Sequence, residues 1–327
     1  MINYFVTWGH KYTVTSFLRT WSNRVGDAFR IVPYEFFSTI KGIRPGAFIF
    51  SDIDRLQPKQ VRDVERFCDL IATEFDPALI LNHPRGLLQR RELLQMLWEK
   101  GINQFRVFPL DYRGDDICYP AFMRFANQHN PASGLLRNAD ERRLAAEKLL
   151  SSTDGDITQA IIIEFCDTIG ADGLYRKYSA FRIGDQIVPG HVLFSPNWIT
   201  KDSPPEPLRE EERSYLAENP HREELRQIFD LAGITYGRID YGLRAGKIQV
   251  WEINLNPTLI QEREKYATDK LALKQQLVDK LSDAFLDVHS RANSVPPRKV
   301  TPPPGLLPLV GFRPRTRLRR LLFTRTL

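Results

Sequence analysis

The stretch from Tyr236 to Pro257 constrains the fold of this chain more than any other part of the sequence. Two runs rich in β-branched and aromatic residues, 235–242 and 247–254, flank the tripeptide Arg244-Ala245-Gly246. Such runs favour extended strands, and a glycine that closes a short polar segment is typical of a three-residue hairpin loop. The stretch therefore predicts a β-hairpin.

One face of this hairpin is expected to carry acidic and amide side chains. Because side chains alternate along a strand, the second strand would present four of them together, Ile248, Val250, Glu252 and Asn254. An odd loop length adds Arg238 and Asp240, with Asp240 diagonal to Glu252 at about 7–8 Å between backbones. Carboxylate and amide oxygens are hard ligands that favour Mg²⁺ or Mn²⁺ over zinc. The pattern predicts a metal–nucleotide platform; the alternative is a hairpin whose polar face meets water.

The order of these residues resembles the metal-binding end of the ATP-grasp superfamily, which includes D-alanine–D-alanine ligases, glutamate ligases and other carboxylate–amine or thiol ligases. The matching residues are Asp240, then Glu252-Ile253-Asn254 twelve to fourteen residues later, then Asn256-Pro257. The resemblance implies that Asp240, Glu252 and Asn254 hold Mg²⁺ (or Mn²⁺) on ATP. It also implies a catalytic role for Arg238, which matches the arginine that steadies the acyl-transfer intermediate in D-alanine ligases.

Two arginines stand where the family usually places ATP-binding lysines. Arg90 follows Asn82-His83-Pro84 near the head of a helix expected over 87–100, where a solvated basic helix start explains it equally well. Arg124 ends a strand expected over 119–124 and precedes a polar loop, 127–134, that is poor in glycine for a phosphate-covering lid. Arginine keeps the charge and binds phosphate through a planar fork, so nucleotide binding can survive both replacements.

The buried run 157–165 resembles the strand that leads to the family's adenine-binding hinge. The resemblance places Glu164 and Cys166 beside the base, with backbone groups pairing to it and aliphatic residues sandwiching it. Lys177, on a strand that enters a turn at Gly184-Asp185, is expected to face the ribose or the phosphates. Lys201 either reaches the γ-phosphate or is a surface lysine.

The chain is expected to be an α/β (α+β) protein with an ATP-grasp core of two subdomains behind a small parallel βαβ domain. Strand signals at 2–7, 47–50 and 78–81 alternate with helix signals at 12–22 and 58–74. The expected domains are 1–84 (βαβ), 85–290 (ATP-grasp, divided into a lid-side part, 85–165, and a metal-binding part, 166–290) and a Pro/Arg-rich tail, 291–327. Within them, 204–220 is expected to be a surface excursion or lid, and 222–232 and 261–288 to be helices.

Composition indicates in which compartment the protein is expected and which partners it is expected to bind. The 327 residues include no apolar run long enough for a membrane span, and three scattered cysteines favour reduced thiols in a cytoplasmic protein. The net charge is +6, but the segment 295–327 holds eight basic residues and no acid, so the remainder carries 6 − 8 = −2. No nucleic-acid partner is expected for such a body. The tail is expected to be disordered, or else a basic amphipathic helix for an anionic membrane or an acidic partner.

Together these features predict an ATP-dependent carboxylate ligase with ATP and Mg²⁺ as cofactors. A small-molecule or peptide carboxylate would be phosphorylated to an acylphosphate, and an amine or similar nucleophile would take the acyl group. A non-catalytic ATP-binding module and a tail-driven scaffold with a vestigial core are the alternatives. The sequence leaves the oligomeric state open, a homodimer being one option.

Overall fold

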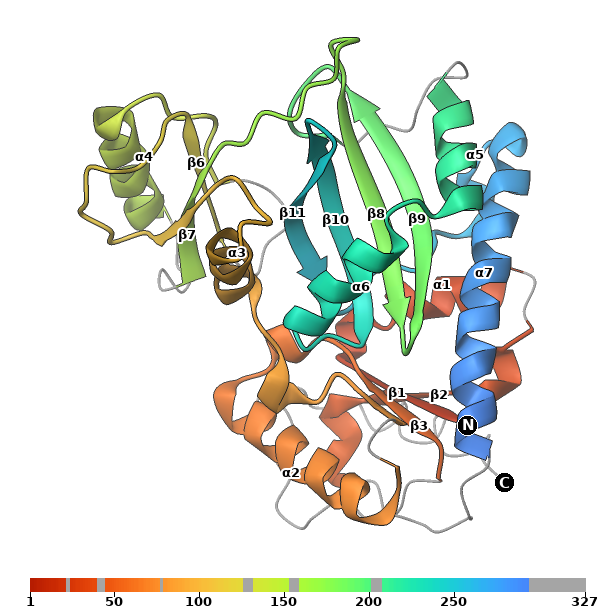
Figure 1. Cartoon of the computed structure of the whole chain (residues 1–327). Helices are drawn as coiled ribbons and strands as arrows, with labels where there is room; N and C mark the ends of the chain where they lie inside the picture. Colours follow the sequence, from red (N-terminus) through yellow and green to blue (C-terminus); the bar gives the residue numbers. More distant parts are fainter. Residues whose placement is uncertain are drawn as a thin grey trace.

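The protein, seen in a computed structural model that describes residues 1–21, 24–39, 45–76, 79–125, 132–152, 159–200 and 208–293, is built on three β-sheets (Figure 1). A four-stranded sheet comes first in the chain, and a three-stranded and a second four-stranded sheet follow it. This order confirms the expected fold class. Lys201, most of the loop 127–134 and the tail 295–327 lie outside the described residues.

The N-terminal sheet is parallel, with the order β2-β1-β3-β4. Its strands are β1 (Ile2–Val6), β2 (Phe29–Pro33), β3 (Ala47–Phe50) and β4 (Ile80–Leu81). The expected helices are present as α1 (Tyr12–Thr20) and α2 (Pro58–Glu74), which pack in separate cores on the two faces of the sheet. The edge strand β2 was not predicted, because most of its residues are half-buried and show no clear alternation.

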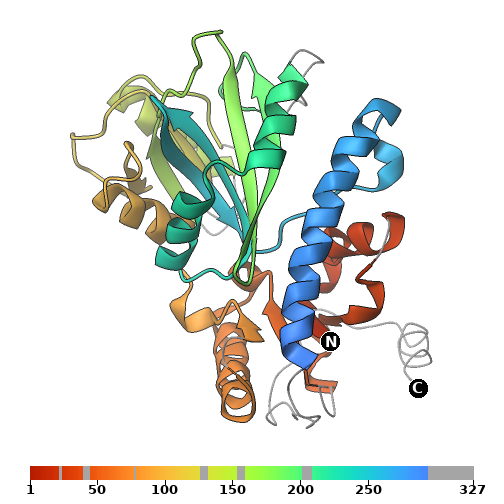
Figure 2. The ribbon, with the colours of Figure 1, turned by 45° about the vertical axis from the view of Figure 1, so that its right-hand side comes forward.

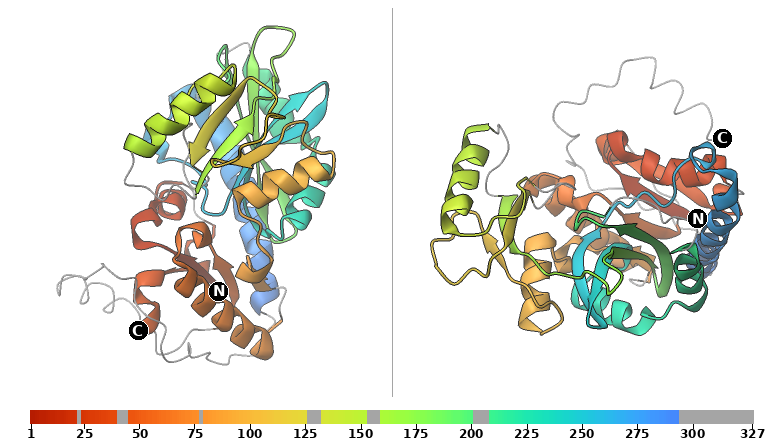
Figure 3. Two further views of the ribbon diagram at one scale, coloured as in Figure 1. Left: turned by 90° about the vertical axis from the view of Figure 1, so that its left-hand side faces the viewer. Right: turned by 90° about the horizontal axis from the view of Figure 1, so that it is seen from above.

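The three-stranded sheet, with the order β5-β7-β6, is antiparallel and lies in the segment expected to be the lid-side part, so it is called the lid-side sheet below. It comprises β5 (Val107–Pro109), β6 (Ala121–Phe125) and β7 (Ala160–Glu164), with β7 buried throughout. Helix α3 (Arg90–Glu99) leads into it, and α4 (Ala139–Ser152) packs beside β6, as Figure 3 shows.

The third sheet, with the order β11-β10-β8-β9, is antiparallel and carries the predicted hairpin. Its strands are β8 (Tyr175–Ile183), β9 (Gln186–Ser195), β10 (Tyr236–Arg244) and β11 (Lys247–Asn254). Helices α5 (Arg209–Glu218) and α6 (Arg222–Leu231) pack against β9, and the long α7 (Thr268–Asn293) runs beside both this sheet and the N-terminal one (Figure 2). No helix in the described part of the chain is long and apolar enough to cross a membrane.

The segment expected to be a surface excursion at 204–220 is, over most of its described length, the packed helix α5. Tyr215 and Leu216 are buried, and the Tyr215 hydroxyl donates to the Ser179 carbonyl at 2.7 Å. The prediction was wrong because the helix buries an inner side, on which even Glu212 is covered and pairs with Lys274 at 2.8 Å.

The hairpin turns over two residues rather than three. Arg244 pairs with Lys247, and the intervening Ala245 and Gly246 have φ values of 49° and 76°, as the tight mirror-image turns of hairpins require. With that turn alone, Asp240 would lie opposite Trp251. A β-bulge after Asp240 instead places it directly opposite Glu252.

The bulge also reverses the alternation of side chains along β11, so that Ile248 and Val250 face one side of the sheet and Glu252 faces the other. Ile248 and Val250 pack in the large core together with Tyr241, whereas Trp251 and Glu252 line a pocket on the other side. The prediction that Ile248 and Val250 share a face with Glu252 was therefore wrong. Asp240 and Glu252 do share a face, as a direct cross-strand pair rather than a diagonal one.

A buried asparagine at the end of β4 fixes the hairpin to the N-terminal sheet. Asn82 has a φ of 65°, and its carbonyl oxygen accepts the backbone N–H groups of Thr235 and Tyr236 at 3.0 and 2.9 Å. Its amide donates to the carbonyls of Phe50 and Tyr236 at 3.2 and 2.7 Å. Because a buried amide with all these partners allows little rotation, it holds the start of β10 at the carboxyl ends of the parallel strands.

Candidate active site

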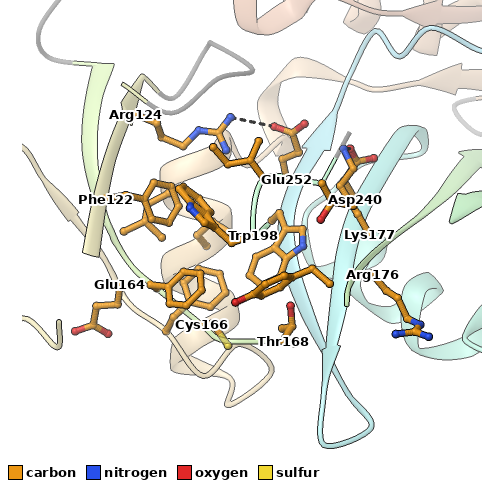
Figure 4. Close-up of a pocket in the computed structure, with 18 residues that line it drawn as sticks. Phe122, Arg124, Glu164, Cys166, Thr168, Arg176, Lys177, Trp198, Asp240 and Glu252 are labelled. Carbon is orange, nitrogen blue, oxygen red and sulfur yellow. Dashed lines mark hydrogen bonds and ion pairs between the residues drawn. The ribbon is translucent and has the colours of Figure 1, made fainter. Parts of the chain in front are cut away.

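A pocket of about 160 Å³ lies between the lid-side sheet and the hairpin sheet (Figure 4). Phe122 and Arg124 come from β6, Lys177 from β8, Asp240 from β10 and Glu252 from β11. One end of the pocket is aromatic, and the other carries charged side chains of both signs. This division suits a ligand with a flat apolar part and an anionic part.

The aromatic end is built around Trp198. Its ring lies 5.0 Å from that of Phe122 and 5.8 Å from that of Phe165, measured between centroids. Trp251, beside the bulge, stacks at a tilt on Phe105 at 5.5 Å. Aliphatic residues were expected around the base, and Leu94, Ile163 and Ile199 line the same pocket beside these rings. Sequence reasoning missed the aromatic residues because a single tryptophan after a strand reads equally well as core.

At the charged end, Glu252 is held by two arginines from the lid side. Arg90, in the first turn of α3, and Arg124, on β6, both pair with its carboxylate, Arg124 at 3.4 Å. Figure 4 shows Arg124 reaching across the pocket to Glu252. The side chains of all three are about nine-tenths buried, with exposed fractions of 9–10%. Because Arg90 is buried and contacts Glu252, it is not simply a solvated basic residue at the start of a helix.

Asp240 pairs with two cations from its own sheet. Arg238 Nε lies 2.8 Å from Asp240 Oδ1, and Lys177 Nζ lies 3.4 Å from Oδ2. Burial alone would lower the pKa of Arg238, but the Asp240 carboxylate outweighs it and raises that pKa. The structure therefore brings together six predicted site residues: Arg90, Arg124, Lys177, Arg238, Asp240 and Glu252.

This group has an excess of positive charge, since four cationic side chains surround two carboxylates. Burial and the neighbouring Arg90 lower the pKa of Arg124 to about 10, although Glu252 opposes the shift. Arg124 is thus a partly dehydrated cation that a further anion would stabilise. The arrangement is suited to a polyanionic ligand.

Two predicted site residues do not present their side chains to the charged end. Burial alone would raise the pKa of Glu164, but its ion pair with Arg106 at 2.7 Å lowers it, and the carboxylate also accepts the Cys118 N–H at 2.7 Å. In Figure 4 the Glu164 carboxylate points away from the pocket. Cys166 is buried in the pocket wall, 3.6 Å from the Gln249 side-chain oxygen, and burial raises the pKa of its thiol.

Asn254, the third expected metal ligand, lies opposite Arg238 at the end of the hairpin. Its side-chain oxygen accepts the backbone N–H of Asn256 at 2.9 Å. Asn254 lines a second cavity together with Arg238, rather than the aromatic pocket.

No family model matches the chain, and no curated protein matches it. Among solved structures it is similar to the D-alanine–D-alanine ligase of Bacillus anthracis complexed with ATP (12% identity, 89% of this chain, 98% of that chain, TM-score 0.49). It is also similar to a RimK domain ATP-grasp protein of Sphaerobacter thermophilus (12%, 88% and 100%, 0.43) and to an L-amino acid ligase of Bacillus licheniformis (11%, 90% and 77%, 0.43).

In the structure itself, a parallel domain precedes two antiparallel sheets that enclose a pocket, and the carboxylates of the hairpin face cations from the lid side across it. These are the parts and the order that the sequence resemblance implied.

Proposed function

We propose that this protein is an ATP-dependent ligase that activates a carboxylate as an acylphosphate and passes the acyl group to an amine or similar nucleophile. The observation that carries the proposal is the pair Asp240–Glu252, set directly across two strands and surrounded by four cations at the polar end of an aromatic pocket. Such a site positions phosphates and stabilises developing charge without a protein nucleophile.

The aromatic end of the pocket is the proposed site of the adenine. Trp198 and Phe122 offer flat apolar faces, and the chain leaving β7 at Phe165 and Cys166 runs along the wall. Stacking on aromatic rings gives affinity, and backbone groups of a hinge give selectivity for the base. Lys177, between this end and Asp240, is placed for the ribose or the phosphates.

The donor set fits a divalent cation of the magnesium type. Asp240 and Glu252 supply carboxylate oxygens from adjacent strands, and Asn254 lies two residues beyond Glu252 on β11. The described residues include no cluster of three or more His, Cys, Asp or Glu side chains able to hold a metal. Mg²⁺ usually accepts only one or two carboxylates and completes its shell with phosphates and water. When bound here with ATP, the ion would neutralise charge on the transferred phosphoryl group.

The cations then have separate tasks. Arg90 and Arg124 would grip phosphate oxygens from the lid side, exchanging part of their contact with Glu252 for contact with the nucleotide. Arg238 stands at the boundary between the aromatic pocket and the second cavity, because it pairs with Asp240 and lines the latter. It is placed to stabilise negative charge on the acyl oxygens during phosphorylation and attack.

The test is substrate-dependent ADP release by the purified full chain across a matrix of carboxylates and amines. Wild type should release ADP with a matching pair, and Asp240→Asn should abolish this while remaining folded. Asp230→Asn is the matched control: Asp230 pairs with Arg182 at 2.5 Å outside the pocket, so its loss should leave activity intact. Equal activity in Asp240→Asn and wild type would contradict the metal assignment.

A non-catalytic ATP-binding module is the second candidate. The arginines at both phosphate positions favour it, since a planar guanidinium does not replace a compact ammonium in a tight site. Tight binding of Mg²⁺·ATP without ADP release from any carboxylate–amine pair would select this alternative.

A further inference from the structure

A second, strongly polar cavity of about 110 Å³ lies on the other side of Arg238 from the aromatic pocket. The hairpin contributes Arg238 and Asn254 to its wall, and the N-terminal domain contributes His10, Asp52 and Arg55. Because Arg238 also pairs with Asp240, the two cavities meet at one guanidinium. A group bound in the second cavity therefore lies beside the place where the acylphosphate would form.

The most buried charge in this cavity is Asp52, which lies two residues beyond the end of the parallel strand β3. Its φ of 56° lies in the left-handed region, a conformation that costs an L-residue free energy and is concentrated at functional sites. One carboxylate oxygen, Oδ2, accepts the Thr7 N–H at 3.1 Å and the Thr7 hydroxyl at 2.6 Å. These contacts fix the carboxylate in place.

The other oxygen of Asp52 is buried but accepts no hydrogen bond from the described residues. The nearest cationic atom recorded for it is Arg55 Nε at 3.4 Å, on a side chain that is one-third exposed. A buried carboxylate oxygen without a donor is costly, and a charged N–H donor is the partner that relieves this most. Asp52 Oδ1 is thus placed to accept a hydrogen bond from a small cationic donor at the most buried point of the cavity.

His10 lies next to Asp52, and its hydrogen bonds define the tautomer of its neutral imidazole. Its Nδ1 is 2.8 Å from the Thr7 hydroxyl oxygen and 3.4 Å from Asp52 Oδ2. The Thr7 hydroxyl has one proton, which it donates to Asp52, so it must accept the proton on His10 Nδ1. In the neutral imidazole Nε2 then carries the lone pair, and it can take up a proton.

We propose that this cavity binds the acyl acceptor as a primary amine, with its ammonium group on Asp52 and His10 Nε2 as the proton acceptor. The proposal rests on the proposed ligase function and narrows the nucleophile to an amine. The ammonium gives one proton to His10, and the freed lone pair attacks the acylphosphate carbonyl carbon. The new C–N bond replaces the C–O bond to phosphate, and the leaving phosphate takes the second proton from nitrogen.

The binding step is tested on the full chain without turnover. Methylammonium chloride is titrated while the ¹H–¹⁵N signals of the His10 imidazole are followed, with tetramethylammonium chloride as the control that has no N–H donor. Wild type should show a saturable change with methylammonium alone. Asp52→Asn should weaken that response about ten- to a hundredfold, the range expected for a charge-assisted hydrogen bond.

A matched variant separates this effect from loss of folding. Glu35→Gln also converts a carboxylate that supports the loop after β1 into an amide, since Glu35 accepts the Trp8 N–H at 2.9 Å, but it lies outside the cavity wall. It should keep the methylammonium response. Equal responses to the two ammonium ions, or a full response in Asp52→Asn, would overturn the assignment.

The proton-transfer step is tested with a carboxylate that supports ADP release, using hydroxylamine as nucleophile. Hydroxylamine is largely unprotonated near neutral pH, so it needs neither Asp52 nor His10. His10→Gln should lose most ADP release with a primary amine yet keep hydroxamate formation with hydroxylamine. Equal loss with both nucleophiles would refute the role of His10, whereas absence of ADP release in wild type would instead refute the ligase function.

Discussion

Replacing Glu252 by glutamine removes one negative charge from the centre of the site and keeps the shape of the side chain. Its partners, Arg90 and Arg124, stay where they are, about nine-tenths buried. The substitution therefore tests whether the carboxylate serves to hold two cations ready for phosphate.

The magnitude follows from the geometry. Unit charges 3.4 Å apart, as in the Arg124–Glu252 pair, attract by about 5 kcal/mol at an effective dielectric constant of about 20. Dehydration of the carboxylate offsets part of this attraction, and the glutamine oxygen still accepts a hydrogen bond. Loss of one member of a buried pair costs about 3 kcal/mol, because the other charges remain buried. For a chain of this size the midpoint of thermal unfolding should fall by roughly 4 °C or more.

The assay is thermal unfolding of wild type and Glu252→Gln, without ligand, with ATP and EDTA, and with ATP and Mg²⁺. The variant should start at a lower midpoint and recover with ATP alone, because phosphates can neutralise the released arginines. Addition of Mg²⁺ should stabilise wild type further and the variant hardly at all.

Glu92→Gln is the control for the same change of charge on α3. Glu92 is about half-exposed and pairs with Arg91 at the surface, so the expected change is within about 0.5 kcal/mol. If Glu252→Gln unfolds at the wild-type midpoint, or keeps the Mg²⁺ effect, the reasoning about this carboxylate is wrong.

Three further outcomes are expected. Trp198→Ala should weaken ATP binding about five- to a hundredfold by calorimetry, since stacking on an aromatic wall contributes about 1–3 kcal/mol. Unchanged affinity would show that the base does not stack on Trp198. Asn256→Ala should lower the free energy of unfolding, measured by urea titration, by about 2 kcal/mol or more. The reason is that its side-chain oxygen accepts hydrogen bonds from the buried hydroxyls of Tyr4 and Thr13 at 3.0 and 2.7 Å. A change below about 0.5 kcal/mol would contradict this. Burial holds the pKa of His191 well below its ordinary value, so the unfolded chain binds a proton that the native state does not bind. Native stability should therefore fall as the pH drops below about 6.5, by up to about 1.4 kcal/mol per pH unit. His191→Gln should make this dependence less steep between pH 6.5 and 5, and an unchanged slope would refute the contribution of His191.

Local patterns were enough to identify most elements of this fold. The helix Pro58–Glu74 and the strand Ala47–Phe50 have the bounds that periodicity predicted, because each buries a continuous apolar face. The edge strand Phe29–Pro33 and the helix Arg209–Glu218 were missed. The helix is covered on one side only, so its sequence looks polar, whereas the strand is a short run in which only Val32 is fully buried.

At the site, the residue types were readable from the sequence and their arrangement was only partly so. Asp240 and Glu252 were placed on one face for an incorrect reason, a three-residue loop, whereas the structure achieves it with a two-residue turn and a bulge. The aromatic wall around Trp198 and the Asp52–His10 pair were not predicted, since they join residues from different sheets and loops.

The sequence by itself determined that this chain would form a hairpin bearing two carboxylates, behind a parallel βα domain. That much follows from turn residues and side-chain periodicity, which act over a few neighbouring positions. Only the tertiary structure decided which side chains meet. Arg90, Arg124 and Lys177 reach the carboxylates from three separate elements, and a bulge of one residue sets the facing of Glu252. Convergence of this kind depends on how whole sheets pack, which short-range patterns do not encode.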